Sequence, residues 1–391
     1  MRKFISYICE MLFNQIIGQE HIKNHLQTSA KNGRIPHAQL FIGKEGSGTL
    51  PMAIAYAQFL LSHFSDNPEA SELKVSKLQH PDLHFAFPVT TNDSVKKHPV
   101  SNLFLQEWRD FIKNHPYGSL FNWLRFIGVE NKQGLIGVDE ALEVVKKLQL
   151  KSYEGGFKVM IIWMAEKMNI AASNKLLKLI EEPPEKTIFL LITENEDQII
   201  NTIKSRCQAL HFPVLSEQDI ANALIQREQA SENDALKIAH QAEGNFNKAL
   251  HLLHQDSSDI VFEKWFITWI RSAFKAKGNA AVIQELVVWS ETIAKTGRET
   301  QKQFLEYCLQ FFRQALLLNY KSPDLVFLET QTPKFDLQNF APFVHSENIL
   351  AIEKEISEAM YHIERNGNAK IILLDLSMKL TRFLHKKEVK V

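Results

Sequence analysis

Four short apolar runs, separated by segments long enough for helices, limit what this chain can fold into more than any other feature. The runs cover residues 39–42, 158–163, 187–192 and, more weakly, 209–212. They are continuous rather than alternating, which is typical of strands covered on both faces in a parallel sheet. Residues 169–182 have the length of a helix and end at Pro183-Pro184, so a strand–helix–strand unit spans the second and third runs. We therefore expect a parallel α/β domain that extends to about residue 213.

The sequence changes character after Pro213. From residue 216 onward nearly every segment has the pattern of an amphipathic helix, interrupted by Gly244 and by loop-like residues near 322–343. We predict an α/β domain over 11–213, a short helical segment over 214–256 and an all-helical domain over 257–391.

An aromatic-rich insertion covers about residues 84–134 of the expected α/β domain. Phe104, Trp108 and Phe111 follow one another there at helical spacing. Such a stripe either docks a partner or packs as a small subcore on the sheet domain. We favour the subcore, because apolar side chains that recur along one helix face most often point to the core.

Charge and cysteine content exclude several classes of protein. The 391 residues carry 45 Lys+Arg against 45 Asp+Glu, so the formal net charge is zero, whereas a protein that binds nucleic acid over its whole surface normally has a basic excess. Cys9, Cys207 and Cys308 lie too far apart for a disulfide framework or a cysteine-built zinc site. No apolar run approaches the roughly 18 residues of a membrane span, and no signal peptide is evident. We expect a cytoplasmic protein with no metal site and no membrane contact.

The glycine-rich turn between the first strand and the following helix has the setting of a phosphate loop. Such loops follow the pattern G-x-x-x-x-G-K-[ST]: backbone N–H groups and the lysine hold the phosphates, and the hydroxyl binds Mg²⁺. The turn contains three glycines, Gly43, Gly46 and Gly48. Thr49 and Leu50 stand at the lysine and hydroxyl positions, and neither side chain can replace the residue expected there.

The acidic residue that would hold Mg²⁺ is also missing from its expected position. Phosphate-loop ATPases hold Mg²⁺ with an aspartate at the end of a strand, but here Trp163 and Met164 end the second run. Glu166 comes three residues too late, and we interpret it as a solvated loop charge. Glu45 places a negative charge inside the loop itself. The sequence therefore predicts no bound Mg·ATP and no intrinsic ATPase activity.

Four motifs occur in one order along the chain, namely Phe-Asn-Gln-Ile-Ile-Gly-Gln at 13–19, His-Pro-Asp at 80–82, Asn-Lys-Leu-Leu-Lys-Leu-Ile-Glu-Glu-Pro-Pro at 174–184 and Ser-Arg-Cys at 205–207. Over about residues 13–255 the chain resembles the bacterial clamp-loader branch of the AAA+ superfamily. With its degenerate nucleotide site it is most similar to the delta-prime type of subunit of the DNA polymerase III clamp loader. The resemblance implies an AAA+ sheet domain, a helical lid over 214–256 and a helical collar over 257–391 that joins the subunits. It also implies that residues 1–10 are an extension from an upstream start.

The resemblance assigns roles to residues outside the phosphate loop. Arg206 matches an arginine that reaches ATP bound by the neighbouring subunit, with Ser205 and Cys207 completing its motif; such a finger stabilises charge on the transferring phosphoryl group. Thr193 matches a polar sensor of the γ-phosphate, which we expect to be structural here. Asn247 stands where the lid normally carries a phosphate-sensing arginine. We expect Cys207 to be a packing residue rather than a nucleophile.

The implied partners are the gamma/tau and delta subunits of the clamp loader and, through the complex, the sliding clamp and primed DNA. The family often carries a four-cysteine zinc module after the phosphate-loop helix, but residues 60–134 contain no cysteine, so we expect neither zinc nor another cofactor. The chain would be an accessory subunit of the polymerase holoenzyme, whose nucleotidyltransferase activity resides elsewhere.

Three functions are therefore compared: a non-hydrolysing clamp-loader subunit, an active AAA+ ATPase of the gamma/tau type, and an unrelated P-loop-like binding module outside replication. Thr49, Leu50 and Trp163 argue against the active ATPase. The motifs at 174–184 and 205–207 argue against the unrelated module.

Overall fold

The computed structural model describes residues 13–65, 67–129, 131–254, 257–277, 279–322, 326, 330, 332 and 335–387. The chain divides into two compact units, one of Met1–Val129 with Gly134–Leu253 and one of Glu130–Gln133 with His254–Val391. The extension predicted over residues 1–10 lies outside the described residues.

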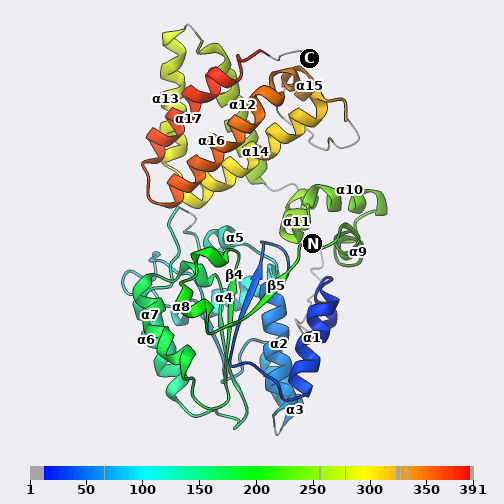
Figure 1. The fold of residues 1–391 in the computed structure, drawn as a ribbon, viewed down its shortest axis with the longest axis vertical. Coiled ribbons are helices and arrows are strands. Elements are labelled where there is room, and N and C mark those ends of the chain that lie inside the picture. The colour runs from blue at the N-terminus through cyan, green and yellow to red at the C-terminus, as the bar shows by residue number, and fades with distance from the viewer. Residues whose placement is uncertain are drawn as a thin grey trace. The chain divides into compact units, whose positions relative to one another are not determined.

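The first unit alternates strands and helices (Figure 1). Its strands are β1 (Ala38–Gly43), β2 (Leu83–Ala86), β3 (Lys158–Ile162), β4 (Thr187–Thr193) and β5 (Gln208–Phe212). Its α-helices are α1 (Glu20–Lys31), α2 (Thr49–His63), α3 (Pro68–Ser76), α4 (Leu105–Asn114), α5 (Leu120–Phe126), α6 (Val138–Gln149), α7 (Ile170–Glu181), α8 (Asn201–Lys204), α9 (Glu217–Glu228), α10 (Glu232–Ala242) and α11 (Phe246–His254). Short 3-10 turns are η1 (Phe13–Gln15), η2 (Ser101–Phe104), η3 (Ala165–Lys167) and η4 (Glu196–Gln198).

Within the described residues, the sheet has five strands in the order β2-β3-β4-β1-β5, and every neighbouring pair is parallel. The four predicted strands are confirmed. The strand β2 was not predicted, because it is only four residues long and runs into the aromatic-rich insertion. The prediction that β5 is covered on both faces is wrong, because β5 is an edge strand in which Phe212 alone is buried.

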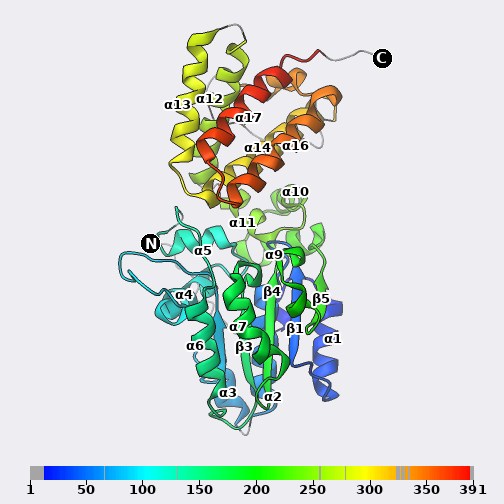
Figure 2. The same ribbon diagram turned by 60° about the vertical axis from the view of Figure 1, so that its left-hand side comes forward.

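Side chains of the central strands alternate between two cores, one on each face of the sheet. In β4, Ile188, Leu190 and Ile192 pack into the cluster that contains α2, whereas Phe189 and Leu191 pack into the cluster that contains α6 and α7. Figure 2 shows α6 and α7 over one face of the sheet. Because both faces are covered, the strand sequences are continuous apolar runs. Helix α2 is buried along almost its whole length.

The aromatic side chains of the insertion belong to the core of the first unit. Trp108 and Phe111 of α4 and Trp123 of α5 are fully buried in the same cluster as α2 and one face of the sheet. The Trp108 ring stacks on Phe87 with 4.1 Å between centroids. The subcore interpretation is therefore confirmed for these residues, although Phe126 remains 39% exposed.

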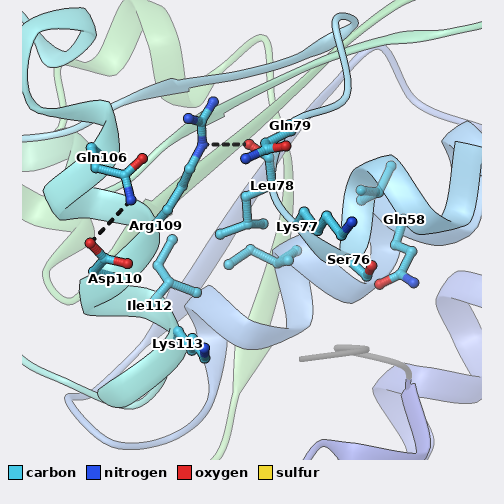
Figure 3. A pocket seen from close by; sticks show the side chains of 12 residues that line it. Gln58, Ser76, Lys77, Leu78, Gln79, Gln106, Arg109, Asp110, Ile112 and Lys113 are labelled. Atoms are coloured by element: carbon cyan, nitrogen blue, oxygen red, sulfur yellow. Dashed lines mark hydrogen bonds between the residues drawn. The ribbon is translucent and has the colours of Figure 1, made fainter. Parts of the chain in front are cut away.

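A cavity of about 270 Å³ lies beside this subcore, between α2, α3 and α4 (Figure 3). Polar groups at its rim pair with one another: Arg109 Nε donates to the Leu78 carbonyl (3.0 Å), and Gln106 Nε2 donates to Asp110 Oδ2 (3.1 Å). None of the motif residues named from the sequence lines this cavity.

Helices α9, α10 and α11, which we call the lid helices, follow the sheet and have a small core of their own. Ala235 and Ala239 of α10 pack there against Leu224 of α9 and Phe246 of α11, and Tyr117 from the insertion joins the same cluster. Gly244, with φ +84°, makes the turn between α10 and α11.

The second unit consists of helices over its described residues: α12 (Ser257–Lys275), α13 (Ala280–Ala294), α14 (Arg298–Asn319), α15 (Leu337–Phe340), the 3-10 turn η6 (Ala341–Phe343), α16 (Ser346–Glu364) and α17 (Ala369–Phe383). Its core is rich in aromatic residues, and the buried Trp269 donates its indole N–H to Ser377 Oγ (2.8 Å). No described helix in either unit is long and apolar enough to cross a membrane. The predicted fold class, a parallel α/β sheet domain with helices following it and an all-helical C-terminal part, is confirmed.

Candidate functional site

The loop between β1 and α2 has the strand–turn–helix arrangement that the sequence predicts for a phosphate loop. Gly46 and Gly48 have φ values of +72° and +92°, a conformation that glycine adopts without strain. Gly43 lies so close to β5 that an added Cβ would come within 2.8 Å of Phe212 Cβ. The loop therefore keeps its glycines for backbone shape and close packing.

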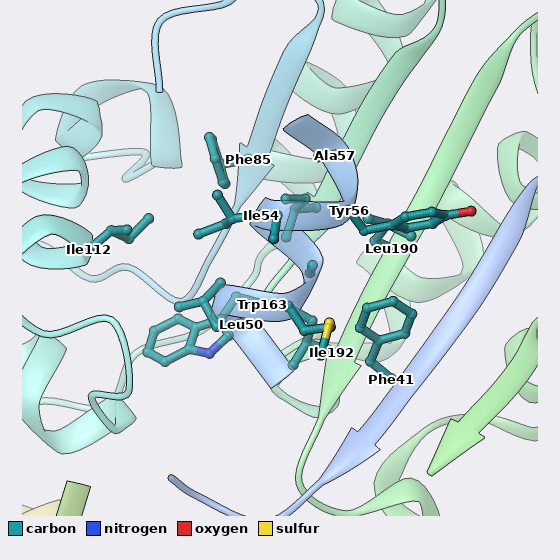
Figure 4. Close-up of a cluster of buried hydrophobic side chains, with 14 of the residues drawn as sticks. Phe41, Leu50, Ile54, Tyr56, Ala57, Phe85, Ile112, Trp163, Leu190 and Ile192 are labelled. Carbon is teal, nitrogen blue, oxygen red and sulfur yellow. The ribbon is translucent and has the colours of Figure 1, made fainter. Parts of the chain in front are cut away.

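The two side chains at the lysine and hydroxyl positions point into the protein. Thr49 is 9% exposed and Leu50 is 3% exposed. Leu50 packs in the α2 cluster beside Trp163 (Figure 4). Leu50 therefore belongs to the core and supplies no hydroxyl for Mg²⁺, and Thr49 supplies no cation to the loop.

Tyr117, which comes from the insertion, covers the start of α2. Its hydroxyl accepts a hydrogen bond from the Ile17 backbone N–H (2.9 Å), and its ring packs edge-on against Phe246 of α11 at 5.1 Å. A side chain added at Gly48 would come within 3.1 Å of this ring. Burial raises the pKa of Tyr117, so the phenol remains neutral. An aromatic side chain thus occupies the end of α2 toward which a phosphate would be drawn.

The residues that end β3 are also buried. Trp163 is 3% exposed, and its ring lies 5.1 Å from that of Trp108. Met164 is buried and has a left-handed backbone with φ +54°, which is unusual for a residue with a long side chain. Neither side chain offers a magnesium ligand.

The interpretation of Glu166 as a solvated loop charge is wrong. Its carboxylate Oε1 accepts from the backbone N–H of Glu194 (3.1 Å), and burial raises the pKa of the carboxyl group. The interaction ties the segment after β3 to the end of β4. Thr193, at that strand end, is fully buried, and its hydroxyl is used within a local turn, donating to the Asn195 carbonyl (3.1 Å) and accepting from the Asn195 N–H (3.2 Å).

Two asparagine side chains, Asn247 in α11 and Asn245 just before it, contact the loop. Asn247 Nδ2 donates to Glu45 Oε1 (2.8 Å) and to Asn122 Oδ1 of α5 (2.9 Å), and Asn245 Nδ2 donates to the same Glu45 oxygen (3.3 Å). Loop, lid and insertion therefore meet at Asn247. No arginine is present at this position to bind a phosphate.

Arg206 lies at the edge of the unit, just after α8. Its guanidinium donates from Nη1 to the Thr202 carbonyl (2.9 Å) and from Nη2 to Glu181 Oε1 at the end of α7 (2.9 Å). Ser205 Oγ also bonds to the Thr202 carbonyl (3.2 Å) and accepts from Arg206 Nη1 (3.4 Å). The Arg206 side chain is 32% exposed. Two helix ends thus hold the guanidinium in place while part of it faces solvent.

Cys207 follows in a more enclosed position. Burial raises the pKa of its thiol to about 11, so the thiol is protonated at neutral pH and is a poor nucleophile. It packs against the core that covers the α6 and α7 face of the sheet.

The His-Pro-Asp motif has a structural role in this arrangement. The Asp82 carboxylate accepts from the backbone N–H groups of Tyr153 and Glu154 and from Ser152 Oγ (2.9–3.2 Å). His80 is 4% exposed, and its Nδ1 accepts from the Asp82 N–H (3.1 Å). The motif therefore fixes the loop that leads into β3. Across the described part of the chain, no group of three His, Cys, Asp or Glu side chains is arranged to hold a metal ion.

Comparison with known proteins identifies the family. A family model described as "DNA polymerase III, delta subunit" matches residues 18–216, just over half of the chain. The chain belongs to this family. This membership confirms the resemblance to the clamp-loader branch of AAA+ proteins. The matched residues include the sheet, the loop and Arg206.

Relatives of this DNA polymerase III family member include more than one type of subunit. The chain is 30% identical over 214 residues to the DNA polymerase III subunit delta' of Bacillus subtilis (strain 168), covering 54% of this chain and 52% of the relative. It is 29% identical over 248 residues to subunit tau of the same organism, covering 62% of this chain and 37% of the relative. The matches thus span between about a third and half of these relatives. A DNA polymerase III gamma subunit-related protein from Thermotoga maritima has a similar solved structure, with a TM-score of 0.32, 16% identity, and coverage of 92% of this chain and 99% of that one.

Sequence reasoning found the motif positions of this family member and missed the residues that contact them. Tyr117 lies in the aromatic-rich insertion, and no motif marks it as a neighbour of the loop. Glu181 was read as part of the 174–184 motif, with no link to Arg206, which is 25 residues away. Asn122 carried no signal at all. Each of these contacts joins segments far apart in the sequence, so spacing alone could not reveal it.

Proposed function

We propose that the chain is a non-hydrolysing, delta-prime-type subunit of the DNA polymerase III clamp loader, which helps to load the sliding clamp onto primed DNA. One contrast carries the proposal: the positions that would bind Mg·ATP are buried and hold Thr49, Leu50 and Trp163, whereas Arg206 is held at the edge of the same unit and is partly exposed. The subunit would scaffold the complex and supply Arg206 to a neighbouring ATPase subunit.

Several contacts oppose nucleotide binding by the chain itself. Leu50 and Trp163 pack against the core, Tyr117 covers the start of α2, and Glu45 would repel a phosphate in the loop. In a phosphate-loop ATPase, a lysine and Mg²⁺ neutralise the phosphates. Because this chain supplies neither a lysine in the loop nor a side chain to hold Mg²⁺, binding of Mg·ATP is expected to be weak and the chain would have no cofactor.

The geometry of Arg206 suits action on a nucleotide held by another subunit. A planar guanidinium presents paired N–H donors to phosphate oxygens, which a lysine cannot do. Its bonds to Thr202 and Glu181 fix the side chain near the ends of α7 and α8. The partners would be gamma/tau and delta subunits, with the second unit as the collar that joins them, in the cytoplasm. Clamp and primed DNA would be reached through the complex.

The test is DNA-stimulated ATP hydrolysis and clamp loading by reconstituted complexes that carry Arg206→Ala, Arg206→Lys or the wild-type chain. An arginine finger contributes about 10³–10⁵ in rate at the site it serves. Total turnover should fall by less, because only one of several sites is affected. Arg206→Lys should not restore the rate. Arg34→Ala, which removes an exposed arginine after α1, is the matched control and should leave both assays unchanged.

The other functions make different predictions in the same experiment. Wild-type rates with the Arg206→Ala complex would mean that the residue is only a surface charge. ATP turnover by the isolated chain, abolished by a substitution in its own 43–48 loop, would identify an active ATPase of the gamma/tau type. Failure to assemble with replication proteins would favour a binding module outside replication.

A further inference from the structure

Hydrogen-bond donors from α11 and from Asn245, the residue before it, converge on one carboxylate oxygen of the phosphate loop. Glu45 Oε1 accepts from Asn247 Nδ2 at 2.8 Å and from Asn245 Nδ2 at 3.3 Å. The donors lie 202 and 200 residues from Glu45 in the sequence. Two independent side chains thus use the same anion, which sits inside the loop that in other proteins surrounds a phosphate.

The chemistry of the contact fixes how each side chain is oriented. An ionised carboxylate only accepts hydrogen bonds, so both asparagines must turn their amide nitrogens toward Glu45. Asn247 then uses one amide hydrogen for Glu45 and the other for Asn122 Oδ1. Asn247 is 7% exposed. Its donors are fully used, and a buried amide of this kind is costly to leave unpaired.

The backbone of the loop is shaped to fit the lid. Phe246 N–H donates to the Gly46 carbonyl (3.3 Å), and a Cβ at Gly46 would come within 2.0 Å of Asn245 Oδ1. The first turn of α11 therefore rests directly on the residue after Glu45. Lys248 lies on the same helix, and Glu45 counteracts the decrease in its pKa that burial causes, so this lysine also experiences the loop carboxylate.

We infer that the start of α11 carries an anion-binding site, formed by the Asn245 amide just before the helix and the Asn247 amide in its first turn, which the chain's own Glu45 carboxylate fills. The carboxylate holds the lid on the loop without any nucleotide. This goes beyond the proposed function, because it concerns contacts within one chain and requires no partner and no role for Arg206.

Hydrogen exchange of the isolated full-length chain tests the inference. Glu45→Ala should speed amide exchange in residues 246–254 about tenfold or more, since hydrogen bonds to a charged group are among the stronger ones. Glu45→Gln, whose amide oxygen still accepts, should have a smaller effect. Glu185→Ala removes an exposed carboxylate from the same unit and should leave the exchange of 246–254 unchanged.

A rescue experiment separates an anion site from a general loss of packing. Acetate, added at constant ionic strength against chloride, should slow the exchange of residues 246–254 in Glu45→Ala and have no effect on the wild type. Asn247→Ala should raise exchange as Glu45→Ala does, and acetate should not reverse it.

Wild-type exchange in Glu45→Ala, or faster exchange that acetate does not slow, would overturn the inference. Should Glu45→Ala fail to fold, Asn247→Ala and Glu45→Gln still decide the matter by exchange in the same peptide. None of these results depends on complex assembly, so the lid contact and the role of Arg206 can fail separately.

Discussion

The phosphate loop and the Arg206 edge belong to one sheet domain, but they hold their motif residues in opposite environments. At the loop, the side chains of Leu50 and Trp163 are almost completely buried and pack in the same hydrophobic cluster. At the edge, the Arg206 side chain is 32% exposed and its pairing partner Glu181 is 49% exposed. The first region is part of the interior, and the second is part of the surface.

The difference shows how a site can lose its ligand chemistry without a loss of fold. Protein interiors are close-packed, and an internal position that no longer serves a ligand leaves a cavity unless a larger apolar side chain fills it. An arginine at the surface leaves no cavity, and an exposed ion pair contributes little to stability. Stability therefore explains Trp163 well and Arg206 poorly.

The largest expected effect tests whether position 163 is truly interior. Trp163→Ala should lower the free energy of unfolding of the first unit by about 3–5 kcal/mol, the usual cost of removing a buried aromatic side chain. Urea denaturation of the full chain measures it. Tyr153→Ala, which removes a 77% exposed aromatic residue, should cost less than about 0.5 kcal/mol. Equal costs for the two variants would mean that Trp163 faces an open site.

Lys248 provides a pH-dependent test on the lid side of the loop. Burial lowers the pKa of its ammonium group from 10.5 to about 8, and the side chain is 21% exposed. The folded chain therefore releases this proton at lower pH than the unfolded chain, and the wild type gains stability as pH rises from about 8 to 10.5.

Lys248→Met removes this titration and keeps the long apolar stem. The variant should be more stable than the wild type at pH 7, by up to roughly 3 kcal/mol at 1.36 kcal/mol per pKa unit. The difference should shrink between pH 8 and 10.5, as measured by urea denaturation across that range. A pH-independent difference would mean that Lys248 is solvated like a surface lysine.

Patterns local in sequence predicted most of the fold. Continuous apolar runs identified four strands because both faces of this sheet are covered. They failed for β2, whose four residues include the half-buried His84, and they overestimated the burial of β5, because an edge position depends on the order of strands in space. Glu166 was misjudged for a similar reason: its neighbours in sequence give no sign that the Glu194 N–H lies 3.1 Å away.

The candidate site was predictable as a set of positions and not as a set of contacts. The loop, the strand end at Trp163 and the Arg206 motif all follow from residue types at known spacing. The side chains around the loop do not follow from spacing, because Tyr117 comes from the insertion and Asn247 from the lid, where it also bonds to Asn122 of the insertion. Each of the three lies more than 70 residues from Glu45 in the chain. Only packing brings these segments together.

The smallest expected effect concerns the Arg206–Glu181 pair, and it sharpens the contrast between edge and interior. The Nη2–Oε1 distance is 2.9 Å, but both side chains are substantially exposed, so solvent screens their attraction. Glu181→Gln should lower the free energy of unfolding by at most about 1 kcal/mol, and the difference should fade at high salt because screening shortens the range of the interaction. A double-mutant cycle with Arg206→Gln, measured by urea denaturation at low and high salt, isolates the pairwise coupling.

Coupling well above 1 kcal/mol that survives high salt would place the pair in an interior-like environment, and the distinction between a filled interior and an exposed edge would no longer hold. A small, salt-sensitive coupling would mean that folding does not require the Arg206–Glu181 pair. The guanidinium would still be held by the bond from its Nη1 to the Thr202 carbonyl, and the exposed side chain adds little to the core.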